Sequence, residues 1–515
     1  MAHGWSEEER PPRPQEDEPE QRSLASSLPL IEQARTLTGK GIRQAEHTAR
    51  HTTRKIRLRS RGAANRMAIA RSRARRAYPA TLLVVLSCLL ALLACDLSPS
   101  FLPVLSRGAP GREAAPQAGV ELPTPTPYPT QPPLTFADRT RLTANYLLSQ
   151  MTLDEKIGQM MMFETYSQSY DSEMDQMVRQ MHAGAIIIYK KNMVSPTQLT
   201  DFISTSQSNA TIPMFVTMDE EGGNVDRLGD LQFNPPLPSA SWLGASGNPD
   251  LASQAGAHAA AELTSYGINT DLAPVVDVRV VPGQIEGPRL YGNDPNTVVT
   301  YASAFLQGLQ QNQVIGCLKH WPGIGAANQD PHLTLPVIDR TRDQLESTEF
   351  AAFRNMLKYN PGMIMVTHVI LSAIDPTMPS SLSPTIVQGI LRDELGYNGV
   401  IITDNLWMQG ISSKYSLGQA AVLAIQAGDD LLEGAWNAQA LSEMISAVKN
   451  AVQSGQISVA RIDQSVRHLL TLKAAYGIVP LHGFHIPPGL NPGLTSAPIA
   501  APDMADLPHG SAYLG

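Results

Sequence analysis

Eight short apolar runs recur along the chain between residues 160 and 434, and segments of helical character separate them. The runs are Met160–Phe163, Ala185–Tyr189, Met214–Asp219, Thr270–Asp277, Val314–His320, Met363–Val369, Val400–Asp404 and Asp430–Gly434. Continuous apolar strands are typical of a sheet that is buried on both faces, and their alternation with helices indicates parallel pairing. Eight such units predict an α/β fold with a single (β/α)8 TIM barrel, and a doubly wound open sheet is the alternative.

The segments between these runs have the length and composition of helices. They are Pro196–Ser208, Leu251–Tyr266, Thr297–Gln311, Thr341–Tyr359, Pro384–Glu394 and Gly418–Ala427. A further segment, Ser458–Tyr476, carries apolar residues at helical spacing. We expect it to form an amphipathic helix that closes the domain.

Residues 1–78 form a polar, basic arm that contains 17 Lys and Arg but only 9 Asp and Glu. The whole chain carries a formal net charge of −8, so the residues after the arm are strongly acidic. A segment so rich in Arg, Glu and Pro buries too little apolar surface to offset its ordering entropy, and we predict that it is disordered. Nucleic-acid binding is disfavoured because the arm lacks interleaved aromatic residues and adjoins a segment with the features of an export signal.

That segment, residues 79–96, is apolar and comes after a cluster of arginines that ends at Arg76. Positive charge before an apolar run favours a cytoplasmic amino end and export of the chain beyond the run. The run is short for a spanning helix, which needs about 20 residues, and fits a signal sequence that begins at Met67. It ends in Leu92-Leu93-Ala94-Cys95, which resembles a bacterial lipoprotein cleavage box and implies acylation of Cys95. An uncleaved signal anchor is the alternative, and in both cases we expect a membrane-anchored body on the extracellular side.

Two Pro-rich segments flank the body: a linker over residues 97–135 and a Pro- and Gly-rich tail over residues 481–515. They leave residues 136–480 as the folded domain. Of the three cysteines only Cys317 lies in it, so no disulfide can form within it. No Cys/His array has metal-ligand spacing, and we expect neither a metal nor another cofactor.

Polar and ionisable residues recur at the carboxyl ends of the predicted strands. They are Asp219 with Glu221, Asp277, Lys319 with His320, His368, Asp404 and Glu433. One such Asp is readily explained as the N-cap of the next helix, but Lys and His are poor N-caps. Because the parallel strands of a barrel end at one face, these residues predict a shared active-site mouth.

The residue types at this mouth suit cleavage of a glycosidic bond, which needs a nucleophile or base on one side of the anomeric carbon and a proton donor on the other. Asp404 ends an apolar run and so has the rigid support that a nucleophile requires. Asp330 can orient His332 and stabilise its protonated form, which makes this pair a candidate proton donor. A loop turn with an exposed imidazole is the alternative for the pair.

Four further residues are candidates for binding sugar hydroxyls. Lys319 and His320 offer hydrogen-bond donors and Asp219 offers an acceptor. Arg289 is a candidate clamp, with a surface salt bridge as its alternative. The glycines after His320 belong to a loop at the end of a predicted strand, where ligands bind in α/β proteins.

In combination these motifs resemble glycoside hydrolase family 3, in its bacterial β-N-acetylglucosaminidase branch. The resemblance runs from Met151 to Val466 and rests on Asp219-Glu220-Glu221-Gly222-Gly223, Leu272-Ala273-Pro274-Val275-Val276-Asp277-Val278, Lys319-His320-Trp321-Pro322-Gly323 and Asp404. It implies a retaining mechanism, with Asp404 as the nucleophile and His332, assisted by Asp330, as the acid/base. It also implies that the non-reducing sugar is bound by Asp219, Arg289, Lys319 and His320, and that His368 lines the site.

The Asp330–His332 pair also bears on the subfamily. β-Glucosidases of this family generally take their acid/base from a second domain, whereas here only a short tail comes after the barrel. The resemblance therefore implies β-N-acetylglucosaminide glycans as substrates, with peptidoglycan fragments as the natural ones. A β-glucosidase and a non-catalytic wall-glycan-binding barrel are the alternatives, and the sequence predicts no particular oligomeric state.

Overall fold

The computed structural model describes residues 135–231, 233–281, 287–327, 329 and 334–481. The chain divides into two units, residues 1–124 and 125–515, and every described residue belongs to the second. The predicted arm, the export segment with Cys95 and almost all of the linker and tail lie outside the described residues. Their assignments stay predictions. Within the described ranges, no helix combines the length and apolarity needed to cross a bilayer.

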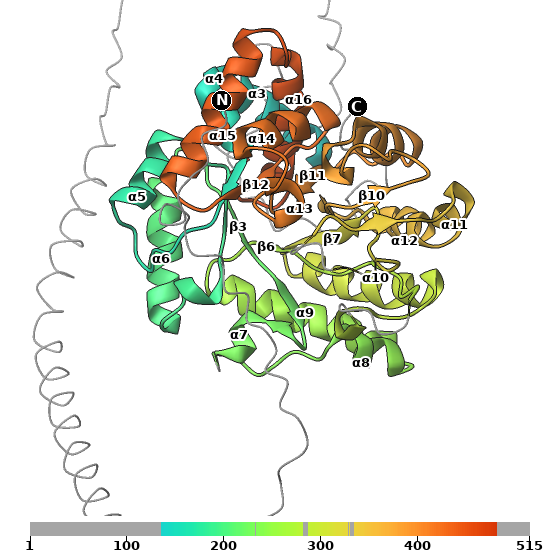
Figure 1. The fold of residues 1–515 in the computed structure, drawn as a ribbon. Coiled ribbons are helices and arrows are strands. Elements are labelled where there is room, and N and C mark those ends of the chain that lie inside the picture. Colours follow the sequence, from blue (N-terminus) through green and yellow to red (C-terminus); the bar gives the residue numbers. More distant parts are fainter. Residues whose placement is uncertain (1–134, 232, 282–286, 328, 330–333, 482–515) are drawn as a thin grey trace, which may run out of the picture. The chain divides into compact units, whose positions relative to one another are not determined.

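Eight parallel strands form the centre of the described body (Figure 1). They are β1 (Met161–Phe163), β2 (Ala185–Ile187), β3 (Phe215–Met218), β6 (Thr270–Asp271), β7 (Ile315–Trp321), β9 (Met363–Val366), β11 (Val400–Thr403) and β12 (Leu432–Ala435). Each predicted apolar run contains one of them, in whole or in large part, and every residue in these strands is buried. The expectation of a parallel sheet buried on both faces is therefore confirmed.

The sheet curls into a nearly closed barrel. Its strand order is β11-β9-β7-β6-β3-β2-β1-β12, and the first and last strands meet through the bridge between Ile402 and Leu431. Thr403 N–H donates to Leu431 O at 3.0 Å, and Leu431 N–H donates to Ile401 O at 3.0 Å. This arrangement agrees with the predicted (β/α)8 barrel and excludes the open doubly wound sheet.

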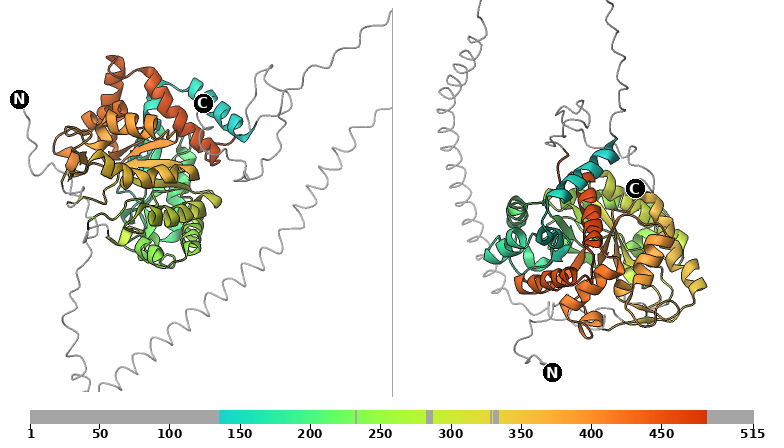
Figure 2. Two further views of the ribbon diagram at one scale, coloured as in Figure 1. Left: turned by 90° about the vertical axis from the view of Figure 1, so that its right-hand side faces the viewer. Right: turned by 90° about the horizontal axis from the view of Figure 1, so that it is seen from above.

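Helices form a ring around the strands in Figure 1, and Figure 2 shows the same body from two further sides. The α-helices are α3 (Phe136–Gln150), α4 (Leu153–Gln159), α5 (Ser172–Asp175), α6 (Pro196–Asn209), α7 (Arg227–Asp230), α8 (Ala240–Ala245), α9 (Pro249–Ser265), α10 (Pro295–Gln311), α11 (Arg342–Ser347), α12 (Glu349–Met356), α13 (Gln409–Ser412), α14 (Leu417–Ala427), α15 (Ala438–Gln453) and α16 (Val459–Ala475). The π-helices and 3-10 helices are η3 (Gln176–Gln180), η4 (Lys190–Asn192), η5 (Gly287–Arg289), η6 (Leu357–Tyr359), η7 (Ser380–Leu382) and η8 (Thr385–Glu394). Short strand pairs lie in the loops, namely β4 (Glu220–Gly222) with β5 (Val225–Asp226), and β8 (Val337–Ile338) with β10 (Ile370–Leu371).

Three of the long helices begin with the same local device, an N-cap side chain followed by proline. Ser195, Asn248 and Asp294 each accept a hydrogen bond from a backbone N–H in the first turn of α6, α9 and α10 respectively. Proline fits the next position because its missing N–H would have no intrahelical acceptor there. These starts agree within a few residues with the predicted helices.

Two predicted helices differ in detail from those observed. The segment Thr341–Tyr359 is not one helix, because Thr348, with φ −124° and ψ −82°, separates α11 from α12. The segment Pro384–Glu394 is π-helical over most of its length as η8. The helix α15 was not predicted from its sequence.

At the amino end of the barrel, a network of buried charged and polar side chains joins α16 to the strands. Asp430, just before β12, accepts from the Ser465 hydroxyl at 2.6 Å and lies 3.0 Å from His468 Nδ1, and it also pairs with Arg392. Ser465 and His468 lie on α16, so this network fastens the predicted closing helix to the barrel. The opposite, carboxyl end is left for the ionisable residues that come after the strands.

Candidate functional site

Side chains from different strand ends meet at the carboxyl end of the barrel. The Lys319 ammonium of β7 lies 2.6 Å from Asp219 Oδ1 and 2.5 Å from Glu221 Oε1. Asp219 directly follows β3, and Glu221 lies in β4. Lys319 is only 2% exposed, so its charge is balanced by these carboxylates rather than by water.

Arg289 completes the same cluster from η5. Its Nε and Nη2 donate to the two oxygens of Glu221 at 2.7 and 2.8 Å, which is a bidentate pair. Its Nη2 also lies 3.4 Å from His320 Nε2. Glu221 is therefore shared between Lys319 and Arg289, and this carboxylate was not among the residues predicted to bind the sugar.

The charges of this cluster stabilise one another. Burial disfavours the ionised form of Glu221, but Arg289 and Lys319 hold its pKa well below the usual value. Burial likewise opposes the charge on Lys319, yet Asp219 and Glu221 raise the pKa of this ammonium above its usual value. Two carboxylates and two cations thus form a fixed set of hydrogen-bond donors and acceptors.

His320 is oriented by a buried carboxylate. Its Nδ1 lies 2.6 Å from Asp277 Oδ2, and the second oxygen of Asp277 accepts from Ile324 N–H at 2.8 Å. Asp277 therefore fixes both the imidazole ring and the loop after β7. Gly325 permits the close packing of this loop, since a Cβ at that position would lie 1.7 Å from Val278 O.

Asp404 directly follows β11 and is half-buried. Its Oδ2 accepts from the Thr367 hydroxyl at 2.8 Å, and its Oδ1 accepts from Asn405 N–H at 2.8 Å. Hydrogen bonds to both oxygens favour the ionised carboxylate and set its orientation. The geometry suits the predicted nucleophile, and that role stays a prediction.

His368 lies behind the segment that carries Asp404. Its ring is fully buried, with Nδ1 at 2.7 Å from Ser381 Oγ and Nε2 at 3.0 Å from Asn405 O. The imidazole thus supports the backbone turn after Asp404. Its role in lining the ligand site stays a prediction.

The predicted dyad of Asp330 and His332 lies outside the described residues. The loop that contains it comes after β7, so it starts from the strand that carries Lys319 and His320. Its proposed proton-transfer role stays a prediction.

A second group lies near Asp404, and it contains Glu433, which was expected at the mouth but was given no role there. Glu433, in β12, accepts through Oε1 from the Tyr189 hydroxyl at 3.2 Å and from Asn405 Nδ2 at 3.3 Å. Beyond Tyr189, Lys191 pairs with Glu164 at 2.5 Å. Glu433 and Tyr189 do lie at the ends of predicted strands, but the sequence does not reveal that they point toward each other.

Two tryptophans come after the last two strands of the barrel. The ring centroids of Trp407 and Trp436 lie 4.0 Å apart, and Trp407 N–H donates to Asn405 Oδ1 at 2.9 Å. Both residues are partly exposed. They add an aromatic surface to the side of the mouth that carries Asp404.

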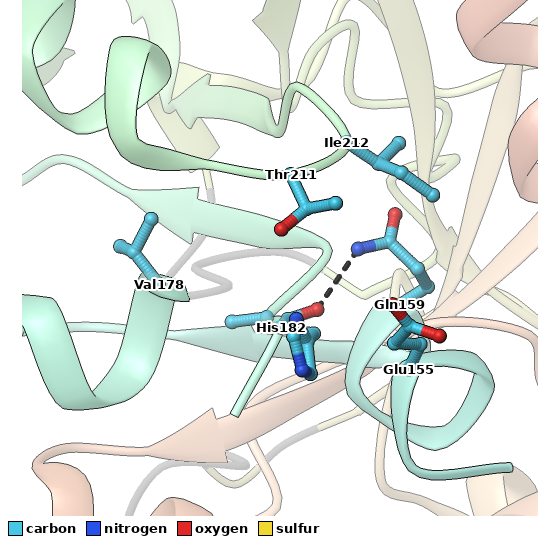
Figure 3. A pocket seen from close by; sticks show the side chains of 7 residues that line it. Glu155, Gln159, Val178, His182, Thr211 and Ile212 are labelled. Carbon is cyan, nitrogen blue, oxygen red and sulfur yellow. Dashed lines mark hydrogen bonds between the residues drawn. The ribbon is translucent and has the colours of Figure 1, made fainter. Parts of the chain in front are cut away.

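A small pocket lies at the opposite end of the barrel, where Gln159, Ala183 and Ile212 precede β1, β2 and β3 (Figure 3). Gln159 Nε2 donates to His182 O at 2.8 Å, the bond dashed in Figure 3. The Glu155 carboxylate in this pocket accepts from Thr152 N–H at 2.7 Å and so caps α4. Because its acidic group is used to cap a helix, we assign the pocket a structural role.

The carboxyl end therefore combines a fixed carboxylate with neighbouring donors and acceptors for a polyhydroxylated ligand. Across the residues that the structure describes, no group of three or more His, Cys, Asp or Glu side chains could hold a metal ion. The chemistry that these described groups can support is nucleophilic attack by Asp404 on a carbon held by the cluster around Lys319.

Known proteins are similar to this chain in sequence and in fold. A β-hexosaminidase of Nitrosomonas eutropha is 31% identical over 297 residues, which cover 56% of this chain and 85% of that protein. A β-N-acetylglucosaminidase/β-glucosidase of Cellulomonas fimi is 26% identical over 342 residues, which cover 64% of this chain and 59% of that protein. The solved structure of a glycoside hydrolase family 3 β-N-acetylglucosaminidase from Paenibacillus sp. matches with a TM-score of 0.62 and 34% identity, over 64% of this chain and 63% of that one.

The family model for the glycosyl hydrolase family 3 N-terminal domain matches residues 152–472. This range includes all eight barrel strands and every described site residue discussed above. The chain therefore belongs to glycoside hydrolase family 3, and the protein is a glycoside hydrolase.

Proposed function

We propose that this protein removes non-reducing terminal β-linked N-acetylglucosamine by a retaining mechanism. The observation that carries the proposal is the Asp404 carboxylate, which Thr367 and Asn405 orient at 2.8 Å each at the carboxyl end of β11. In the first step Asp404 attacks the anomeric carbon, the bond to the leaving oxygen breaks, and a covalent glycosyl-aspartate forms. Water then hydrolyses this ester and returns Asp404 to its ionised state.

The sugar is held by the cluster around Lys319 at the same carboxyl end of the barrel. Asp219 accepts hydrogen bonds from sugar hydroxyls, while Lys319, Arg289 and His320 donate to them. The ion pairs of Lys319 at 2.5 and 2.6 Å keep these groups in place before the substrate arrives. Such preorganisation lowers the entropy cost of placing the anomeric carbon against Asp404.

The leaving group needs a proton, which we assign to His332. Asp330 stabilises the imidazolium, and after the first step the neutral imidazole accepts a proton from the attacking water. This assignment rests on the sequence alone. It puts the donor in the loop that follows β7, the strand that carries Lys319 and His320.

The natural substrates in this proposal are peptidoglycan fragments, and the enzyme acts outside the cell while anchored to the membrane. The support is the export segment at residues 79–96, with Cys95 as the lipidated residue or with the segment as an uncleaved anchor. The β-hexosaminidase names of relatives support the sugar but not the polymer.

A β-glucosidase is the second candidate, because one relative bears both activity names. A non-catalytic glycan-binding barrel is disfavoured by the orientation of Asp404. Turnover of 4-nitrophenyl β-N-acetylglucosaminide and of the matching glucoside by the purified chain separates the three. Equal or faster glucoside turnover would make the enzyme a β-glucosidase, and no turnover of either substrate would refute the proposal.

The mechanism is tested by trapping. A fluorinated, slowly reacting glycosyl donor is expected to add one sugar mass to the peptide that contains Asp404, and Asp404→Asn should abolish labelling. Asp343→Asn, on the exposed face of α11, is the matched control and should label normally. Labelling of another carboxylate, or an inverted product in an NMR assay of the anomer, would exclude Asp404 as the nucleophile.

A further inference from the structure

Glu433 lies in β12, close to Asp404, and the mechanism proposed above does not use it. Its side chain is only 3% exposed, although it is a carboxyl group. Oε1 accepts from the hydroxyl of Tyr189, which comes after β2, at 3.2 Å, and from Nδ2 of Asn405, which comes after β11, at 3.3 Å. A side chain on β12 can reach partners on both sides only by pointing into the barrel mouth.

The charged groups that face Glu433 are themselves mostly carboxylates. They are Asp404 after β11, Asp219 after β3 and Glu164 after β1. The nearby cations bind elsewhere, since Lys319 pairs with Asp219 and Glu221 while Lys191 pairs with Glu164. Among the described residues, no Lys or Arg forms an ion pair with Glu433.

A buried carboxyl group in such a place is expected to keep its proton. Burial and the negative charge of Asp404, followed by Asp219 and Glu164, raise the pKa of Glu433 well above its usual value. A buried carboxyl group that faces other carboxylates, with no Lys or Arg of the described residues paired to it, does not ionise readily. The proton therefore belongs on Glu433, whose Oε1 accepts hydrogen bonds from uncharged groups, the Tyr189 hydroxyl and the Asn405 amide.

We propose that Glu433 is a positioning residue that works as an uncharged carboxylic acid, anchoring Asn405 and Tyr189 beside Asp404 without adding a second negative charge there. This inference rests on the proposed role of Asp404 as the nucleophile. Asn405 links the two carboxyl groups, because its backbone N–H donates to Asp404 while its side-chain amide donates to Glu433. Ionised Glu433 would repel Asp404 and disturb that orientation.

The test compares two substitutions in the whole chain. Glu433→Gln keeps a neutral side chain of the same shape and should retain kcat/KM within about threefold at pH 6. Glu433→Leu removes the acceptor of both hydrogen bonds and should lower kcat about tenfold, which is the effect of losing the bond to Asn405, the residue that orients Asp404. The alkaline limb of kcat should also lie at higher pH in Glu433→Gln than in the unsubstituted enzyme. A Gln variant as inactive as the Leu variant, or an unchanged alkaline limb, would overturn the proposal.

A stability measurement separates this inference from the proposed function. Since the pKa of Glu433 is raised in the folded state, its contribution to stability is full below the unfolded pKa and is lost as pH rises toward the folded pKa. Glu433→Gln should therefore gain stability relative to the unsubstituted protein between pH 5 and pH 9, and a constant difference would contradict an uncharged Glu433. This readout needs no turnover, so it holds even if the chromogenic assays fail.

Asp429→Asn is the matched control. Asp429 is also fully buried with a raised pKa, caused by burial and then by Asp430, but it lies at the amino end of β12, away from the mouth. It should show the same kind of pH-dependent gain in stability and leave the pH profile of kcat unchanged. A shift of the profile in Asp429→Asn equal to that in Glu433→Gln would mean that the shift reports general stability, which would remove the positioning role.

Discussion

Replacement of Lys319 by methionine tests the physical account of the sugar-binding cluster without any assumption about activity. Lys319 is 2% exposed and holds two carboxylates at 2.5 and 2.6 Å. Removing one partner of a buried ion pair costs about 3–5 kcal/mol of unfolding free energy, because the other partner is left buried and unpaired. Arg289 still pairs with Glu221 in the variant, so we expect the lower part of this range, about 3 kcal/mol.

The assay is urea unfolding at pH 7, with Lys449→Met as the control. Lys449 also pairs with an aspartate, Asp154, at 2.7 Å, but its side chain is 38% exposed and that of Asp154 is 56% exposed. An exposed pair contributes at most about 1 kcal/mol, so the control should change the unfolding free energy little. A double variant, Lys319→Met with Asp219→Asn, should recover part of the loss, because it removes the carboxylate that loses its 2.6 Å partner in the single variant.

The pH dependence of this loss of unfolding free energy is a further test. The folded pKa of Glu221 is depressed, so the stability that it contributes is present at neutral pH and is lost as pH falls. The difference between the unsubstituted protein and Lys319→Met should therefore shrink at acidic pH. Equal losses in Lys319→Met and Lys449→Met, or a loss that grows on acidification, would refute the reasoning.

Three other variants address single steps. Asp404→Asn should lower kcat on the order of 10⁴-fold or more, measured with the N-acetylglucosaminide, because a nucleophile is removed; substantial residual turnover would argue for another nucleophile. Thr367→Val keeps the shape of the side chain but removes its hydrogen bond to the Asp404 carboxylate, so kcat should fall about tenfold to a hundredfold. An unchanged kcat would exclude the role of Thr367 in orienting Asp404. Asp430→Asn breaks the buried network with Arg392 and His468 and should cost about 3–5 kcal/mol in urea unfolding, yet leave kcat/KM unchanged because the network lies at the amino end; a selective loss of kcat would contradict that separation.

Much of the barrel could be predicted because its strands are buried on both faces. Such strands must be apolar throughout, so a run such as Val400–Asp404 is visible in the sequence without knowledge of its neighbours. The break at Thr348 between α11 and α12 was not predictable, since nothing in the local pattern of Thr341–Tyr359 ends a helix there. The helix α15 lies outside the predicted helical segments, although buried apolar residues recur along it at helical spacing.

The site was predicted in part for a related reason. Parallel strands end at one face, so Asp219, Lys319 and Asp404 were expected at the same mouth, and the structure places them there. Their partners were not predicted. Glu221 serves both Lys319 and Arg289, and this sharing depends on the path of the loop between β3 and α7, which no spacing rule describes.

The sequence by itself thus determined the eight-strand barrel and the end of the barrel at which ionisable groups collect, because apolar runs that alternate with helical segments indicate buried parallel strands. Its motifs also determined the family. Only the tertiary structure decided which charges neutralise one another and which face groups of their own sign. Lys319 and Glu433 illustrate the difference: both belong to apolar strands, but one is surrounded by carboxylates of opposite charge and the other faces carboxylates like itself. That distinction depends on distances across the barrel, where residues hundreds of positions apart come into contact.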